Sequence, residues 1–125
     1  MIKIKGSEKI IEWFGNWPSF HDSEIVELSL KRKNESFLKI HAWNMTNKVD
    51  EKGQFITEKH ALVIFTLENI TDLELFGFSN QNVISSLDIK IVDEGYNLKL
   101  NPCYGLAGYL VAKNISVEVQ PHAST

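Results

Sequence analysis

Residues 26–42 read VELSLKRKNESFLKIHA, and this stretch decides the fold class. Apolar and polar side chains alternate over 26–30, and they alternate again over 38–42. Alternation with a period of two is typical of β-strands that bury one face, and two such runs around a short polar turn indicate a β-hairpin. Residues 33–36 supply that turn, so the sequence predicts a hairpin early in the chain.

The C-terminal half repeats this pattern. Alternating runs at 87–91 and 96–100 flank a turn at 93–95. A further alternating run at 115–119 predicts a last strand. The glycine-rich segment 105–108 lacks the lysine of a phosphate-binding loop, so we interpret it as a bend or bulge in a strand.

The middle of the chain contains two strand candidates and a polar segment. Residues 61–67 are apolar at both odd and even positions, which is typical of a strand buried on both faces. We expect this strand to lie centrally in the sheet, partly covered by a helix. Residues 70–78 predict another strand, and the polar stretch 44–59 is the longest candidate loop.

The N-terminal region predicts one helix. Ser7 is a suitable cap, and Gly15 and Pro18 end the helical pattern. The apolar residues at helical spacing between these limits are Ile10, Trp13, Phe14 and Trp17. One amphipathic N-terminal helix followed by hairpin-linked strands predicts an α+β fold with a mostly antiparallel sheet.

Composition indicates an ordinary folded domain. The 125 residues are 43% hydrophobic and 23% charged, and we expect one domain over 1–120 with a C-terminal tail over 121–125. The lone Cys103 cannot form an internal disulfide. The chain shows neither a signal-peptide core at its start nor an apolar run long enough to cross a membrane. The expected location is therefore the cytoplasm, without a membrane partner.

The charge distribution favours a protein partner over nucleic acid. The net charge is −3, whereas nucleic-acid-binding proteins usually present a basic face. Between positions 68 and 94 the sole basic residue is Lys90. The acidic residues there are Glu68, Asp72, Glu74, Asp88, Asp93 and Glu94. They either form one acidic surface that attracts a basic protein or remain scattered solvated carboxylates, and the sequence leaves both alternatives open.

The segment 17–24, WPSFHDSE, holds the densest group of chemically versatile side chains. His21, Asp22 and Glu24 are residue types that acid–base catalysis uses, and His21 beside Asp22 would begin a metal site. A metal needs three or four converging ligands, and no ligand pair stands at a recognised spacing. We favour a structural role, in which Asp22 and Ser23 bind backbone amides and His21 bridges the turn to the sheet.

Three other residues have plain interpretations. His41 and His60 lie in or beside predicted strands, and we expect them to be ordinary sheet-face or surface histidines. A catalytic pairing with His21 would need a proximity that the sequence does not define. Cys103 has no neighbouring base, so we expect a small apolar residue rather than a nucleophile.

The element Trp17-Pro18-Ser19-Phe20-His21-Asp22-Ser23-Glu24, followed by an alternating strand, resembles the immunity protein 50 family of bacterial polymorphic toxin systems. The spacing from the amphipathic helix to Trp17-Pro18 fits that family, and so do the strand ending near Trp43 and the segment 103–108 before a final strand. The resemblance covers most of the chain, although 44–82 carries no matching motif.

The resemblance implies a non-enzymatic inhibitor that binds a cognate bacterial toxin domain in the cytoplasm, occludes its surface and needs no cofactor. If the toxin is a basic nuclease, acidic side chains would substitute for phosphates. The expected partner-binding residues are Asp72, Glu74, Asp88, Asp93, Glu94 and Trp43. The expected structural motif is Trp17, Pro18, Phe20, His21, Asp22 and Glu24. We expect a monomer or a weak homodimer. The alternative is a small hydrolase or metal-dependent enzyme that uses His21, Asp22 and Glu24.

Overall fold

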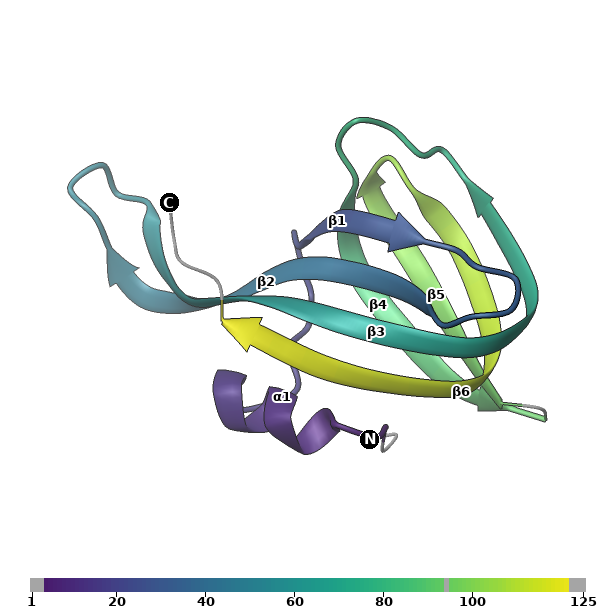
Figure 1. Ribbon diagram of the computed structural model, residues 1–125. Helices are drawn as coiled ribbons and strands as arrows, with labels where there is room; N and C mark the ends of the chain where they lie inside the picture. The colour runs from purple at the N-terminus through teal and green to yellow at the C-terminus, as the bar shows by residue number, and fades with distance from the viewer. Residues whose placement is uncertain (1–3, 94, 122–125) are drawn as a thin grey trace.

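Six antiparallel strands form a closed barrel in the part of the chain that the structure describes, residues 4–93 and 95–121 (Figure 1). The structure is a computed structural model. The elements in chain order are helix α1 (Ser7–Phe14) and strands β1 (Glu24–Ser29), β2 (Ser36–Val49), β3 (Phe55–Phe76), β4 (Val83–Val92), β5 (Gly95–Tyr104) and β6 (Ala107–Pro121). Around the barrel the strands follow the order β1-β2-β3-β6-β5-β4, and the pair Glu24–Val83 joins β1 to β4. The predicted α+β class with a mostly antiparallel sheet is confirmed.

The first predicted hairpin is confirmed as β1 and β2, and it carries one irregularity. Leu28 lies opposite Leu38, and both contribute to the apolar interior. The register shifts between Ile25 and Glu27, which places a bulge at Val26. Ile25 is buried, whereas Val26 is 48% exposed. The regular alternation predicted from Val26 onwards is therefore wrong for β1, because the bulge removes Val26 from the inward-facing series.

β3 contains the strand predicted over 61–67, although a closed barrel has no central strand. It lies between β2 and β6, and it buries residues of both parities, including Ile64 and Phe65. α1 packs mainly against β6 and also contacts β3, as expected for a strand partly covered by the helix. The strand predicted over 70–78 is wrong as a separate element, since β3 continues without a break to Phe76. Asn69, at φ 59°, and a register shift shortly after it bend the strand instead of ending it.

The predicted loop over 44–59 is also wrong. β2 continues to Val49 and β3 begins at Phe55, so a short turn is the only break between them. The paired strands extend beyond the barrel as a two-stranded arm, defined here as residues 44–58 and visible at the left of Figure 1. Most of the arm residues are exposed, so no buried face imposes an alternation, and the pattern resembles that of a loop.

A glycine flanks each end of α1, Gly6 before it and Gly15 after it. Gly15 ends the helix in the left-handed conformation, as predicted. The predicted cap is wrong, because Gly6 is the N-cap residue, no side chain caps the helix, and Ser7 is its buried first residue. A Cβ atom at Gly6 would overlap the carbonyl oxygen of Val117, so the close approach of the helix to β6 requires glycine.

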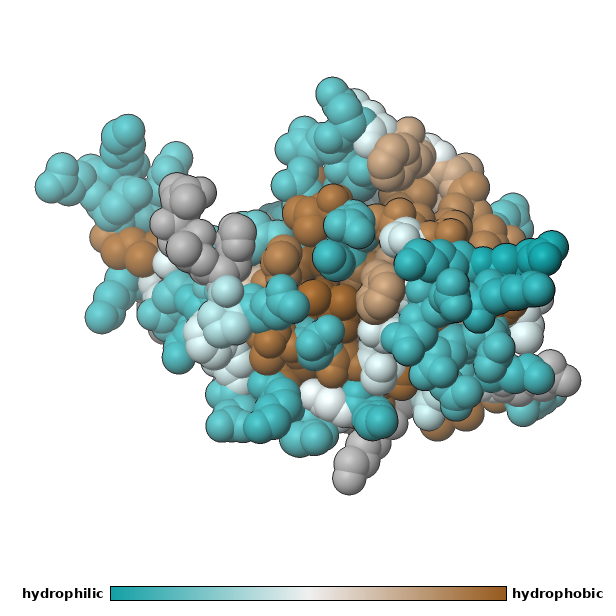
Figure 2. Space-filling view, viewed as in Figure 1, coloured by the Kyte–Doolittle hydropathy of each residue, from teal (hydrophilic) through white to brown (hydrophobic). Residues whose placement is uncertain are grey.

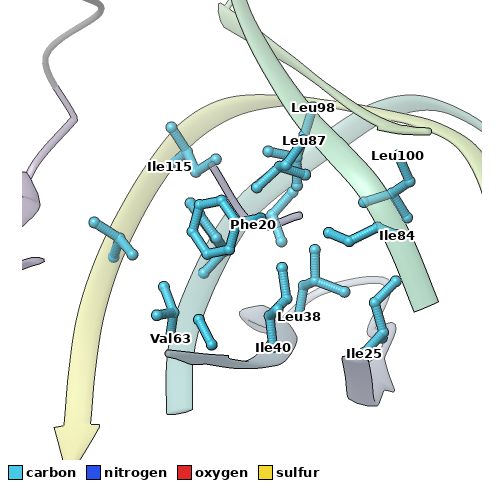
Figure 3. Packing of buried hydrophobic residues seen from close by; sticks show 14 of the residues in the cluster. Phe20, Ile25, Leu38, Ile40, Val63, Ile84, Leu87, Leu98, Leu100 and Ile115 are labelled. Carbon is cyan, nitrogen blue, oxygen red and sulfur yellow. The ribbon is translucent and has the colours of Figure 1, made fainter. Parts of the chain in front are cut away.

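The linker between α1 and β1 places an aromatic plug in the barrel. Phe20 is 2% exposed, and Figure 3 shows its ring surrounded by apolar side chains from several strands. Its ring centroid lies 5.9 Å from that of Trp17 and 6.1 Å from that of Phe65. Phe20 has φ 61°, a costly conformation for a bulky residue that persists where surrounding contacts enforce it.

The C-terminal hairpin is confirmed as β4 and β5, with Leu87 opposite Leu100. Gly105 lies in the bend between β5 and β6, and the predicted last strand is the second half of the continuous strand β6. Pro121, which the prediction assigned to the tail, is the last residue of β6. Residues 122–125 of the predicted tail and Glu94 of the predicted turn lie outside the described residues.

Candidate functional site

Backbone hydrogen bonds hold the segment 17–24 against β4. The amide of Asp22 donates to the carbonyl oxygen of Ile84 at 2.9 Å. In return, the amide of Ile84 donates to the carbonyl oxygen of Ser23 at 3.0 Å. The buried residues of the segment are Pro18, Phe20 and Ser23. The side chains of His21 and Asp22 are 66% and 55% exposed, so this corner buries Pro18 and Phe20 and presents His21 and Asp22 to solvent.

His21, Asp22 and Cys103 form a small polar cluster on this surface. Nε2 of His21 lies 3.5 Å from Oδ2 of Asp22, and Sγ of Cys103 lies 3.8 Å from Oδ1. Nδ1 of His21 lies 3.3 Å from the carbonyl oxygen of Ser85 on β4. The carboxylate therefore lies between the thiol and the imidazole, whereas an activated cysteine has the imidazole beside its sulfur. Cys103 is exposed, so the prediction of a small apolar residue is wrong.

An imidazole–indole cluster lies where the arm leaves the barrel. Nε2 of His41 is 3.0 Å from Nδ1 of His60, and the ring of Trp43 stacks on that of His60 with the centroids 5.7 Å apart. Oγ1 of Thr57 lies 2.9 Å from Nε2 of His60. Sequence reasoning missed this cluster because it treated residues around His60 as a loop, whereas the pairing of β2 with β3 brings them beside Trp43.

α1 fastens the base of the arm. The indole Nε1 of Trp13 donates to the carbonyl oxygen of Lys59 at 3.0 Å, and the ammonium of Lys59 lies 5.0 Å from the centroid of the Trp13 ring. The side-chain amide of Asn44 donates to the carbonyl oxygen of Phe14 at 2.8 Å. These contacts fix the direction in which the arm leaves the barrel.

The predicted acidic residues lie on neighbouring strands of the barrel. Asp72 and Glu74 are exposed on β3, and Glu74 lies opposite Tyr109 of β6. Tyr109 in turn lies opposite Lys99 of β5, which lies opposite Asp88 of β4. The structure therefore brings Asp72 and Glu74 together and separates them from Asp88 by a lysine and a tyrosine.

The other predicted acidic residues lie elsewhere. Asp93 is exposed in the turn that follows β4, and Glu94 lies outside the described residues. Oδ2 of Asp88 accepts a hydrogen bond of 2.8 Å from the side-chain amide of Asn101. Trp43 is half-buried in the imidazole–indole cluster, well separated along β2 and β3 from the carboxylates.

Tyr109 is electrostatically linked to the two carboxylates beside it. Its hydroxyl donates to Oδ2 of Asp72 at 3.1 Å. This hydrogen bond, the negative charge of Asp72 and, to a lesser degree, that of Glu74 raise the pKa of Tyr109 above its usual value, since each disfavours the phenolate.

A groove of about 380 Å³ lies between β1 and the segment that connects β3 to β4. Its lining residues are Glu24, Ile25, Val26, Glu27, Leu28, Phe78, Ser79, Asn80 and Asn82. Figure 2 shows apolar residues around β1 and below the β3–β4 connection, with hydrophilic residues beside them. Glu24 of the predicted catalytic patch thus lines this groove, whereas His21 and Asp22 do not.

A second hollow of about 410 Å³ lies beside the turn between β1 and β2. Its lining carries charges of both signs, namely Lys31, Lys33, Glu35 and Glu68, together with Asn34, Phe37 and Asn69. Within residues 4–93 and 95–121, no group of three or more His, Cys, Asp or Glu side chains is arranged to hold a metal ion. In the same ranges, no helix has the length and apolar character needed to span a membrane.

Comparison with known proteins adds a family assignment. No curated protein and no solved structure matches the chain significantly. Residues 6–121 match the model of the family described as Immunity protein 50, a range that includes the helix, the arm and all strands of the barrel. The match covers nearly the whole chain, so the protein belongs to the Immunity protein 50 family, and this membership implies an immunity protein.

Proposed function

We propose that this protein binds a cognate bacterial toxin domain in the cytoplasm and neutralises it by covering its surface. It acts as a stoichiometric inhibitor rather than an enzyme. The family match over residues 6–121 is the observation that carries the proposal. The outward position of His21 and Asp22, with the carboxylate between the thiol and the imidazole, is consistent with binding rather than turnover at that corner.

The acidic side of β3 is the first contact surface in this proposal. Protein interfaces combine aromatic anchors with a polar rim. Tyr109 is the aromatic anchor here, and the neighbouring Asp72 and Glu74 form the polar rim. Asp88 on β4 and Asp93 in the turn after β4 add further negative charge, and Trp43 supplies a separate anchor near the arm. These carboxylates would attract a basic toxin, such as a nuclease, and raise its rate of association.

Co-expression tests the function. A candidate toxin domain encoded near the gene for this protein is expressed in a sensitive bacterium, with and without the protein. We expect growth to be restored and a one-to-one complex to co-purify. Light scattering on the free protein should report a monomer or a weak homodimer. Failure to restore growth, together with failure to co-purify with this toxin, would contradict the proposal.

Charge reversal tests the acidic surface. The double variant Asp72→Lys/Glu74→Lys should lower the association rate constant about tenfold at low salt, with a smaller loss at high salt because ions screen the attraction. The matched control is Glu8→Lys/Glu12→Lys, which makes the same charge change on exposed residues of α1. Equal association rates for the two variants would remove the acidic surface from the proposal.

A further inference from the structure

The barrel is closed by very little pairing between β1 and β4. Glu24 and Val83 form the one register pair recorded there, and the amide of Ile25 donates to the carbonyl oxygen of Asn82 at 2.8 Å. Beyond Ile25, the described residues place no strand against this edge of β1, while the opposite edge pairs with β2 up to Ser29. An unpaired strand edge offers backbone donors and acceptors to an incoming strand.

The groove defined above runs along this same edge. Its rim exposes two large apolar side chains, Val26 at 48% and Phe78 at 69%. The far wall is held in place by Asn82, whose Oδ1 accepts from the amides of Ser79 (3.0 Å) and Leu106 (2.9 Å). The groove is therefore preformed, and a ligand that enters it pays little ordering cost on the side of this protein.

The charges of the groove select its occupant. Glu24 and Glu27 are the only ionisable residues among its lining residues, and Glu27 lies 3.5 Å from Lys39 on the neighbouring strand. The β1 edge of a second copy, residues 24–29, carries the same two carboxylates and no basic residue, so it does not complement the charges of the groove. Like charges directly opposite each other destabilise a sheet, whereas lysine or arginine there would stabilise it.

We infer that the edge of β1 over Val26–Ser29 is a docking site for an extended segment of the toxin in which basic and apolar residues alternate. The segment would add a strand to β1, with apolar side chains against Val26 and Phe78 and basic ones near Glu24. Four residues of strand span about 13 Å, which sets the length of the paired segment. This inference rests on the proposed function, because it assigns the toxin as the partner.

Hydrogen exchange on the complex tests the site directly. The probe is the purified candidate toxin domain used in the co-expression experiment. Those backbone amides of residues 26–29 that face the open edge, rather than β2, should exchange at least tenfold more slowly in the complex than in the free protein. Protection confined to other segments would overturn the inference, and so would a concentration-dependent dimer that protects these amides without the toxin.

Matched variants provide the second test. Val26→Lys and Phe78→Ala should each weaken toxin binding by about 30-fold, as for an interface hot spot. The controls are Ile91→Lys on β4, where the side chain is 68% exposed, and Phe55→Ala on the arm, where the ring is 57% exposed, and both should bind like the wild type. All four variants are first checked by thermal unfolding. Wild-type affinity for both groove variants overturns the docking site, whereas a wild-type protein that fails to bind the toxin contradicts the proposed function itself.

Discussion

The ring of Phe20 lies with its centroid 6.1 Å from that of Phe65, so a linker residue and a residue of the longest strand share the centre of the barrel. Phe65 is fully buried, and Trp17 contacts both rings. The segment that most resembles a catalytic motif in the sequence therefore supplies the interior of the fold through its aromatic residues.

Replacement of Phe20 should be costly. Phe20→Ala removes a ring that is 2% exposed, and we expect the free energy of unfolding to fall by about 3–5 kcal/mol. Urea denaturation measures this change. Phe78→Ala is the control, because its ring is 69% exposed and its loss should cost less than about 1 kcal/mol. Similar losses in the free energy of unfolding for both variants would contradict the role of Phe20 as an aromatic plug.

Gly108 should not tolerate a side chain. A Cβ atom there would overlap the carbonyl oxygen of Glu74 on the paired strand β3, and φ is +125°. We expect Gly108→Ala to lower the unfolding free energy by about 3 kcal/mol or more, because β3 and β6 must move apart. Thermal unfolding measures the loss.

Gly53 provides the matched control for this substitution. It also has a positive φ of +79°, but a Cβ atom there meets nothing within 4 Å. Gly53→Ala should therefore cost only about 1 kcal/mol, the strain of the backbone conformation alone. A cost as large as that of Gly108→Ala would show that backbone strain, rather than overlap with β3, dominates.

Tyr109 should make stability fall at alkaline pH. Its pKa is raised in the folded state, so from about pH 10 the unfolded chain loses the phenolic proton first and binds fewer protons than the folded chain. The free energy of unfolding therefore decreases as pH rises from there through the raised pKa. Absorbance titration, compared with Tyr109→Phe, isolates this tyrosine. Asp72→Asn should lower its pKa towards the usual value, and an unchanged titration would contradict the assigned cause.

His60 should stabilise the arm locally. Its two ring nitrogens contact His41 and Thr57, so His60→Ala removes one contact between β2 and β3 and one contact within β3 at the base of the arm. We expect amides of residues 44–58 to exchange about fivefold faster, which corresponds to about 1 kcal/mol. His21→Ala is the control, since that side chain is 66% exposed and its Nδ1 lies beside the carbonyl oxygen of Ser85 on β4 rather than at the arm. Equal exchange in both variants would mean that the imidazole contacts contribute nothing.

Local pattern predicted the elements that bury one face. The hairpins β1–β2 and β4–β5 follow from alternation, and the helix follows from apolar residues at helical spacing. The bulge at Val26 could not be predicted, because it depends on how β1 meets the barrel rather than on the side chain itself. The same holds for Gly6, whose requirement for glycine comes from Val117 on a distant strand.

Features that need long-range pairing were missed. The arm lacks a buried face, so nothing in its composition separates it from a loop. The contacts of His60 depend on that pairing, and the groove depends on the weak closure between β1 and β4. For the predicted carboxylates the sequence left both a single acidic surface and scattered charges open. It could not show that Asp72 and Glu74 lie together while Lys99 from β5 lies between them and Asp88.

The bridge between Lys5 and Ser116 joins positions about 110 residues apart, and the amide of Val117 donates to the carbonyl oxygen of Lys5 at 2.9 Å. β3 likewise pairs along most of its length with β6, far from it in sequence. Such a topology has a high contact order, so loops must close before their contacts form. Folding should therefore take milliseconds to seconds rather than microseconds. Under the proposed function, a freshly synthesised chain would neutralise the toxin only after that delay.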